Sequence, residues 1–225
     1  MNDPGFSLVV PPPAELPIFP LPGAMLLPRG RMPLNIFEPR YLRMVSDSLG
    51  AGRMIGMIQP SEPQPGLVED DCMLFDVGCV GRIVQFAETG DGRFLITLAG
   101  QTRFRVAEEI AGRGGYRRVR ADYSPFAGDG LEDGGPLPDR PRLIKAVRAY
   151  FSARGIAGDF SGIDDASDEM LVTSLCMGSP FLPEEKQALL ESSDLGHRAG
   201  LLTALFEMAA NETPGEPGGD APARH

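Results

Sequence analysis

Residues 16–44 read LPIFPLPGAMLLPRGRMPLNIFEPRYLRM. Five prolines interrupt this apolar stretch before Pro39. Proline fixes φ and has no N–H group, so such a segment is poorly suited to a central strand. Its many apolar residues argue against a solvated linker. The stretch therefore predicts short edge strands at Ile18–Leu21 and Leu34–Phe37, joined by buried corners, and then an amphipathic helix from about Pro39 to Leu49.

The expected helix has a well-marked start. Pro39 suits the first helical position, and the preceding Glu38 places a carboxylate near the free backbone N–H groups. Apolar residues recur at helical spacing at Tyr41, Leu42, Val45 and Leu49. We therefore expect Phe37 and Tyr41 to be buried where strand and helix meet.

Downstream, short β-like runs alternate with turns. The turn at residues 89–92, TGDG, lies between two such runs and predicts a hairpin. Gly100 is expected to break the chain after it. Beyond Gly100, alternation places Arg103 and Arg105 on the face opposite Phe104. The runs expected to be strands are 54–58, 81–87, 93–99, 102–110 and 116–123. Many short strands separated by turns predict a small β-barrel.

The composition changes at residues 127–141, AGDGLEDGGPLPDRP, and the hydrophobic period then becomes helical. Helices are expected from about 142, and after starts near Ser167, Pro183 and Asp194. The sequence thus predicts an α+β protein. Its expected parts are a disordered lead-in (1–15), a β-barrel lobe (16–126), a linker (127–141), a helical lobe (142–211) and a disordered tail (212–225).

The bulk composition is that of an ordinary globular protein. The chain has 225 residues, 42% of them hydrophobic and 23% charged. Its three cysteines form no disulfide framework and favour a reducing cytoplasm. The first residues lack the pattern of a signal peptide, and no apolar run is long enough to span a membrane. We therefore expect a cytoplasmic protein with no membrane partner.

Charge is unevenly distributed along the chain. Residues 1–125 hold 14 acidic and 13 basic residues, whereas residues 126–225 hold 17 acidic and 8 basic residues. The second part should therefore repel polyanions. A local basic cluster nevertheless leaves RNA binding open as an alternative. Its members are Arg103, Arg105, Arg113, Arg117, Arg118 and Arg120.

Several segments in this order resemble the substrate-binding N-terminal domain of Lon proteases, in its stand-alone bacterial form. They are the opening stretch to Tyr41, IGMI (55–58), VGCVGRIVQF (77–86), DGRFLITLAGQTRFRV (91–106) and, more weakly, SDEMLVTSLCMGSPFLPEEKQALLE (167–191). The resemblance implies a PUA-like β-barrel lobe followed by a helical lobe. It also implies recognition of other polypeptides.

The sequence lacks the residues of an ATP-dependent protease. No G-x-x-x-x-G-K-[ST] phosphate loop occurs, and no Gly-Lys pair exists. Lys145 and Lys186 lie in polar patterns and are expected to be exposed, which is unsuitable for a Ser-Lys dyad. A hydrolase is therefore the least favoured alternative. His197 is expected on a helix surface, and the cysteines lack metal-ligand spacing, so we expect no cofactor or metal.

Glu38, Arg40 and Tyr41 form the candidate peptide-binding cluster. An acid, a base and an aromatic ring could meet a peptide there. The simpler interpretation is a helix start with a buried tyrosine, and both stay open. We expect a non-catalytic module that binds unfolded or extended polypeptides through an exposed apolar patch, with strand addition at a short barrel edge as a possible mode.

Overall fold

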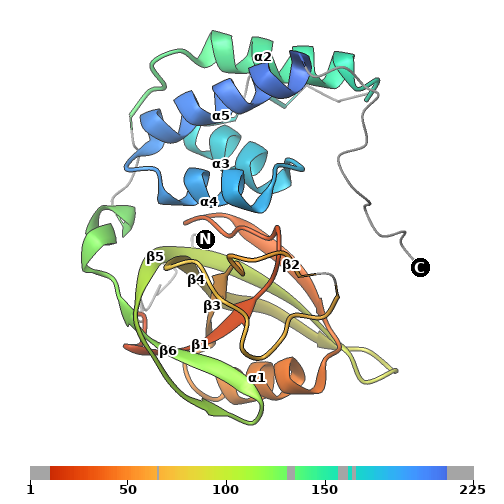
Figure 1. Ribbon diagram of the computed structural model, residues 1–225, viewed down its shortest axis with the longest axis vertical. Helices are drawn as coiled ribbons and strands as arrows, with labels where there is room; N and C mark the ends of the chain where they lie inside the picture. The colour runs from red at the N-terminus through yellow and green to blue at the C-terminus, as the bar shows by residue number, and fades with distance from the viewer. Residues whose placement is uncertain (1–10, 65, 131–134, 157–161, 164–165, 212–225) are drawn as a thin grey trace, which may run out of the picture. The chain divides into compact units, whose positions relative to one another are not determined.

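The computed structural model describes residues 11–64, 66–130, 135–156, 162–163 and 166–211 (Figure 1). The predicted tail and most of the predicted lead-in lie outside these residues. The described chain is α+β, as predicted, and divides into two compact units. The β unit comprises residues up to 132 together with 173–191, and the helical unit comprises 133–172 together with residues from 192 onward.

The β unit is built on one sheet whose strand order is β2-β5-β4-β3-β1-β6. An additional pairing between β5 and β6 closes five of these strands into a ring. All pairings are antiparallel except that of β1 with β3. This closed ring is the barrel that the short strands predicted. The strands are β1 Glu15–Pro20, β2 Arg31–Ile36, β3 Met54–Ile58, β4 Val77–Glu88, β5 Phe94–Arg113 and β6 Tyr116–Asp122.

The proline-rich opening stretch forms one edge strand, not two. β2 pairs only with β5 within the described chain and is an edge. β1 pairs with both β3 and β6, so the edge position expected for Ile18–Leu21 is wrong. Pro17 and Pro20 flank Ile18 and Phe19 in β1, which leaves those two residues free to donate to the ladder. The strand also begins within the expected lead-in, where Tyr123 Oη donates to Pro13 O at 2.8 Å.

The barrel core is centred on Phe104, which is fully buried with apolar residues from β1, β3, β4 and β6. A Cβ at Gly78 would lie 2.6 Å from the Phe104 ring, so a larger residue there would displace the ring. Helix α1 spans Pro39–Leu49, as predicted, and buries Tyr41. Phe37 was expected to be buried and is 53% exposed. It follows Ile36, the buried last residue of β2, and its ring lies 6.0 Å from the Arg93 guanidinium.

Gly100 does not break the chain, contrary to expectation. β5 continues through it as one strand from Phe94 to Arg113. A Cβ at Gly100 would lie 2.0 Å from Leu27 O, so the glycine allows two backbone segments to touch. Gly100 N donates to Gly30 O at 2.9 Å, and Gly100 O accepts from Arg29 N at 2.9 Å.

The remaining elements are η1 Ser124–Gly130, α2 Arg140–Ala153, α3 Asp168–Gly178, α4 Pro183–Glu191 and α5 Leu195–Asn211. Asp139 and Asp194 cap α2 and α5 by accepting from Arg142 N and His197 N at 3.0 and 2.8 Å. In the helical unit α2 packs on α5, with the Tyr150 and Phe206 rings 5.4 Å apart. No helix in the described chain is long and apolar enough to cross a membrane.

Helix α4 groups with the barrel, although it lies within the expected helical lobe. Its Lys186 Nζ donates to Gly23 O at 2.7 Å, and Gln187 Nε2 donates to Val77 O at 3.0 Å. The prediction that Lys186 is exposed is therefore wrong, since only 7% of it is accessible. Burial lowers the pKa of this amine.

Candidate functional site

The start of α1 brings together Glu38, Arg40 and Tyr41. These residues hold the loop between β3 and β4 against the barrel. Arg40 ion-pairs with Glu38 and Asp70, and its Nη2 donates to Val68 O at 2.6 Å. Its guanidinium lies 4.6 Å from the centre of the buried Tyr41 ring. Burial raises the pKa of Tyr41 to about 12, so its hydroxyl stays protonated. Whether this cluster meets a peptide stays a prediction.

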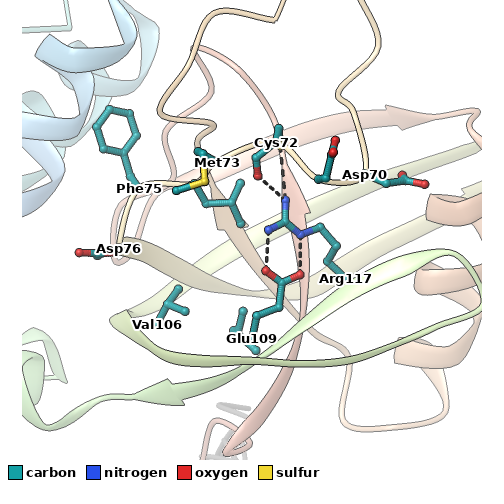
Figure 2. Close-up of a pocket in the computed structure, with 11 residues that line it drawn as sticks. Asp70, Cys72, Met73, Phe75, Asp76, Val106, Glu109 and Arg117 are labelled. Carbon is teal, nitrogen blue, oxygen red and sulfur yellow. Dashed lines mark hydrogen bonds and ion pairs between the residues drawn. The ribbon is translucent and has the colours of Figure 1, made fainter.

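The loop that Arg40 holds forms one wall of a cavity of about 510 Å³, the loop pocket (Figure 2). Strands β5 and β6 form the opposite wall. Aspartates and apolar side chains share the lining, which gives the pocket both an acidic and an apolar character. It is lined by residues 70–76, Val106, Glu109, Arg117 and Val119.

Arg117 is the central polar group of the loop pocket. Its guanidinium donates to both carboxylate oxygens of Glu109, at 2.7 and 2.6 Å. It also donates to Cys72 O at 2.7 Å and lies 3.4 Å from Cys72 Sγ. Figure 2 shows Arg117 between Cys72 of the loop and Glu109 of β5. Burial raises the pKa of the Cys72 thiol, although Arg117 opposes the shift, so the thiol is not activated as a nucleophile.

A second cavity, of about 790 Å³, lies over the β2 edge of the sheet. We call its lining the β2 face: Pro33, Leu34, Asn35, Val84, Gln85, Phe86, Ala87, Leu95, Ile96 and Thr97. None of these described residues carries a charge. Leu95 and Val84 are 48% and 41% exposed, although both lie within strands. Phe86 is 39% exposed, but it is opposite Ile96 in the ladder and therefore lies on the other side of the sheet from Leu95.

The sequence did not identify the β2 face. Leu95 and Val84 belong to apolar strand runs that read as ordinary barrel core. The alternation of apolar and polar residues does not show whether another element covers the second side of a hairpin, because that depends on tertiary contacts. The proline-rich opening stretch was the available signal. It predicted an edge strand at β2 without identifying the apolar side chains on β4 and β5.

The arginine cluster that suggested RNA binding is largely paired with acids. Ion pairs join Arg113 to Asp47, Arg117 to Glu109, Arg118 to Glu15 and Arg120 to Glu108. Arg105 faces Asp122 across the β5–β6 ladder. Arg103 was expected on an outward face and is instead buried, with its guanidinium 2.7 Å from Asp129. β5 keeps its alternation here, with Arg103 on the side opposite the buried Phe104. Arg103 is buried on that side because η1 and α4 cover it there, where its Nη1 donates to Leu190 O at 2.9 Å.

Residues that could support metal or nucleophilic chemistry are dispersed. His197 is exposed on α5, as expected, and the three cysteines are buried and form no disulfide. Within the described ranges, no group of His, Cys, Asp and Glu side chains is placed to hold a metal ion.

Comparison with known proteins identifies a family match over residues 15–207, to the substrate-binding domain of ATP-dependent protease La (LON). The chain is 27% identical over 210 residues to Lon protease 2 of Sorangium cellulosum, covering 85% of this chain and 24% of that protein. It is 22% identical over 209 residues to Lon protease of Escherichia coli K12, with coverage of 86% and 24%. The chain thus spans about a quarter of the length of these relatives.

Solved structures agree on the fold. A Lon N-terminal domain protein from Xanthomonas campestris matches with a TM-score of 0.60 at 22% identity, covering 84% of this chain and 97% of that one. The N-terminal domain of Mycobacterium avium complex Lon protease matches with a TM-score of 0.57 at 13% identity, covering 85% and 97%.

Proposed function

Because this chain belongs to the family of LON substrate-binding domains, we propose that it captures extended apolar segments of other polypeptides on the β2 face. The observation that carries the proposal is an uncharged, partly exposed apolar surface beside β2, whose outer edge pairs with no strand among the described residues. On a chain with a net charge of −10, the absence of charge from so large a cavity lining favours apolar side chains in its occupant.

Strand addition would explain how such a segment binds. An extended peptide alongside β2 gains main-chain hydrogen bonds, and its alternate side chains lie over the β2 face. Pro33 lacks an N–H group and therefore removes one donor from this edge. Fewer ladder bonds limit both self-association and affinity, which suits a module that must release its ligand.

The expected affinity is modest. Burial of roughly 400 Å² of apolar surface at about 25 cal/mol/Å² gives about 10 kcal/mol before costs. Ordering a flexible segment and losing its translational freedom offset much of this value. Micromolar binding is the expected outcome, with weak dependence on salt because few ions are released.

The test replaces apolar side chains on the β2 face. The double variant Val84→Ser/Leu95→Ser should bind a labelled, reduced and carboxymethylated unfolded protein about tenfold more weakly, measured by fluorescence anisotropy. Leu67→Ser is the matched control, because Leu67 is 67% exposed on a loop outside this face. Equal binding by the wild type and the double variant, with unchanged melting temperatures, would remove the β2 face from the proposal.

We further propose that the chain performs no chemistry of its own. Its sequence contains no phosphate loop, and the Lys186 amine donates a hydrogen bond to a backbone carbonyl. Purified protein should neither hydrolyse ATP nor cleave unfolded casein. An ATPase activity that disappears on Lys145→Ala or Lys186→Ala would contradict this. We place the function in the cytoplasm, which is supported by three cysteines that form no disulfide.

For Glu38, Arg40 and Tyr41 we propose an indirect connection to peptide binding in place of the predicted direct one. Their polar groups already face one another and the loop. We propose that they position the wall of the loop pocket and do not themselves touch a ligand.

A further inference from the structure

The loop pocket combines an apolar lining with an acidic rim. Leu74, Phe75 and Val106 are half-buried in it, and Val119 is fully buried. Asp70, Asp71, Asp76 and Glu109 supply the carboxylates. This is the reverse of the β2 face, whose lining carries no charge.

The single cation of the loop pocket does not neutralise its rim. Arg117 is held by both oxygens of Glu109, so these two charges compensate each other. Asp70 forms an ion pair with Arg40, which does not line the pocket. Asp71 and Asp76 are exposed and make no ion pair with any residue in the described chain. The pocket therefore retains negative charge beside apolar surface.

The pocket is also held open by backbone contacts that need no ligand. Ser61 N donates to Met73 O at 2.9 Å, Phe75 N donates to Gln59 O at 3.0 Å, and Val106 N donates to Asp76 O at 2.8 Å. Arg117 fixes the loop at Cys72. A preformed wall lowers the entropic cost of binding.

We propose that the loop pocket binds a basic, apolar segment of a partner polypeptide, with lysine or arginine side chains as its specific feature. Such a side chain has an aliphatic stem and a charged end. The stem would pack on Val106 and Leu74, beneath the 61% exposed side chain of Met73. The charged end would then reach Asp76 or Asp71. A flexible thioether suits stems of different shape.

This second site gives the module a charge preference that the β2 face lacks. It shares with the proposed function only the premise that the partner is a polypeptide. Acidic segments would be repelled at the loop pocket, and basic apolar segments would be retained there.

The test uses two labelled peptides of about eight residues, one alternating lysine with leucine and one with glutamine in place of lysine. The wild type should bind the lysine peptide about tenfold more tightly at low salt, and the preference should shrink as salt rises. Asp71→Asn/Asp76→Asn should abolish most of this preference and leave binding of the glutamine peptide unchanged.

The matched control is Glu62→Gln/Glu69→Gln. It makes the same change in net charge on the same loop, but neither residue lines the pocket. An equal loss of preference in the control would show that overall charge is responsible and would overturn the proposal. A preference that survives Asp71→Asn/Asp76→Asn would overturn it too.

The β2-face variant separates the two proposals. If Val84→Ser/Leu95→Ser weakens the glutamine peptide but preserves the lysine preference, both sites stand. If that variant abolishes the lysine preference, one site serves both peptides and the loop-pocket proposal fails while the proposed function survives. If that variant leaves the glutamine peptide unaffected, only the proposed function fails.

Discussion

Arg103 shows how far one residue can differ from its sequence pattern. Its guanidinium contacts Asp129 at 2.7 and 3.0 Å, donates to Leu190 O at 2.9 Å and lies 4.7 Å from the Phe126 ring. Asp129 also accepts from Arg103 N at 2.8 Å. Removing one partner of a buried ion pair leaves the other charge without compensation.

We therefore expect Asp129→Ala to lower the free energy of unfolding by about 3–5 kcal/mol in urea titrations. The control is Glu108→Ala, which removes the partner of an exposed arginine, Arg120, and should cost less than about 1 kcal/mol. Equal losses of stability in the two variants would show that the buried ion pair contributes no more to the free energy of unfolding than the exposed one.

Lys186 should give the stability a pH dependence with a defined sign. Burial holds its pKa below the ordinary value of 10.5. Between the two pKa values the unfolded chain binds more protons than the folded one, so this contribution to stability increases as pH rises. The free energy of unfolding of the wild type minus that of Lys186→Met should become more positive from about pH 7 to about pH 10.

The chain's other lysine, Lys145, supplies the control for this measurement. It is exposed on α2. The pH dependence of the difference from the wild type should be larger for Lys186→Met than for Lys145→Met, because only Lys186 is buried. A constant difference for Lys186→Met would mean that the buried amine titrates as it does in the unfolded chain.

At the scale of elements, Gly100 decides how β5 passes Leu27. A Cβ there would overlap a backbone oxygen that cannot move without shifting the chain around Pro28. Gly100→Ala should therefore lower stability by about 1–3 kcal/mol, an overpacking cost. Gly90→Ala, where an added Cβ meets nothing within 4 Å, should change it by less than about 0.5 kcal/mol. Melting curves of both variants provide the comparison.

Local signals predicted the elements whose boundaries are set locally. Pro39 and the apolar spacing gave α1 its exact residues, and Asp194 was recognised as the cap of α5. The prediction that Gly100 breaks the chain was wrong because the sequence does not distinguish a glycine that ends a strand from one that allows a close backbone contact. The prediction that Phe37 is buried was wrong because residues distant in the sequence decide whether a position between β2 and α1 is covered.

At the scale of the whole chain, long-range contacts set the division into units. Lys186 reaches a carbonyl 163 positions away, and Gln187 reaches one 110 positions away. No local composition change marks α4 as part of the β unit, so the linker at 127–141 suggested a simpler division. The sequence predicted the presence of a binding module through its family resemblance, but the two candidate surfaces depend on contacts of this kind.

The paired arginines also bear on what the whole molecule binds. A polyanion gains affinity when cations on the protein release its counterions, and each arginine already facing a carboxylate contributes less. The rest of the chain adds net negative charge.

We expect labelled single-stranded RNA to show no retention at about 150 mM salt, while unfolded protein binds there nearly as well as at about 50 mM. Glu109→Gln and Glu108→Gln, which release two arginines, should increase RNA retention at low salt if pairing is what suppresses it. Tight, salt-sensitive RNA binding by the wild type, with no affinity for unfolded protein, would reverse the assignment of function.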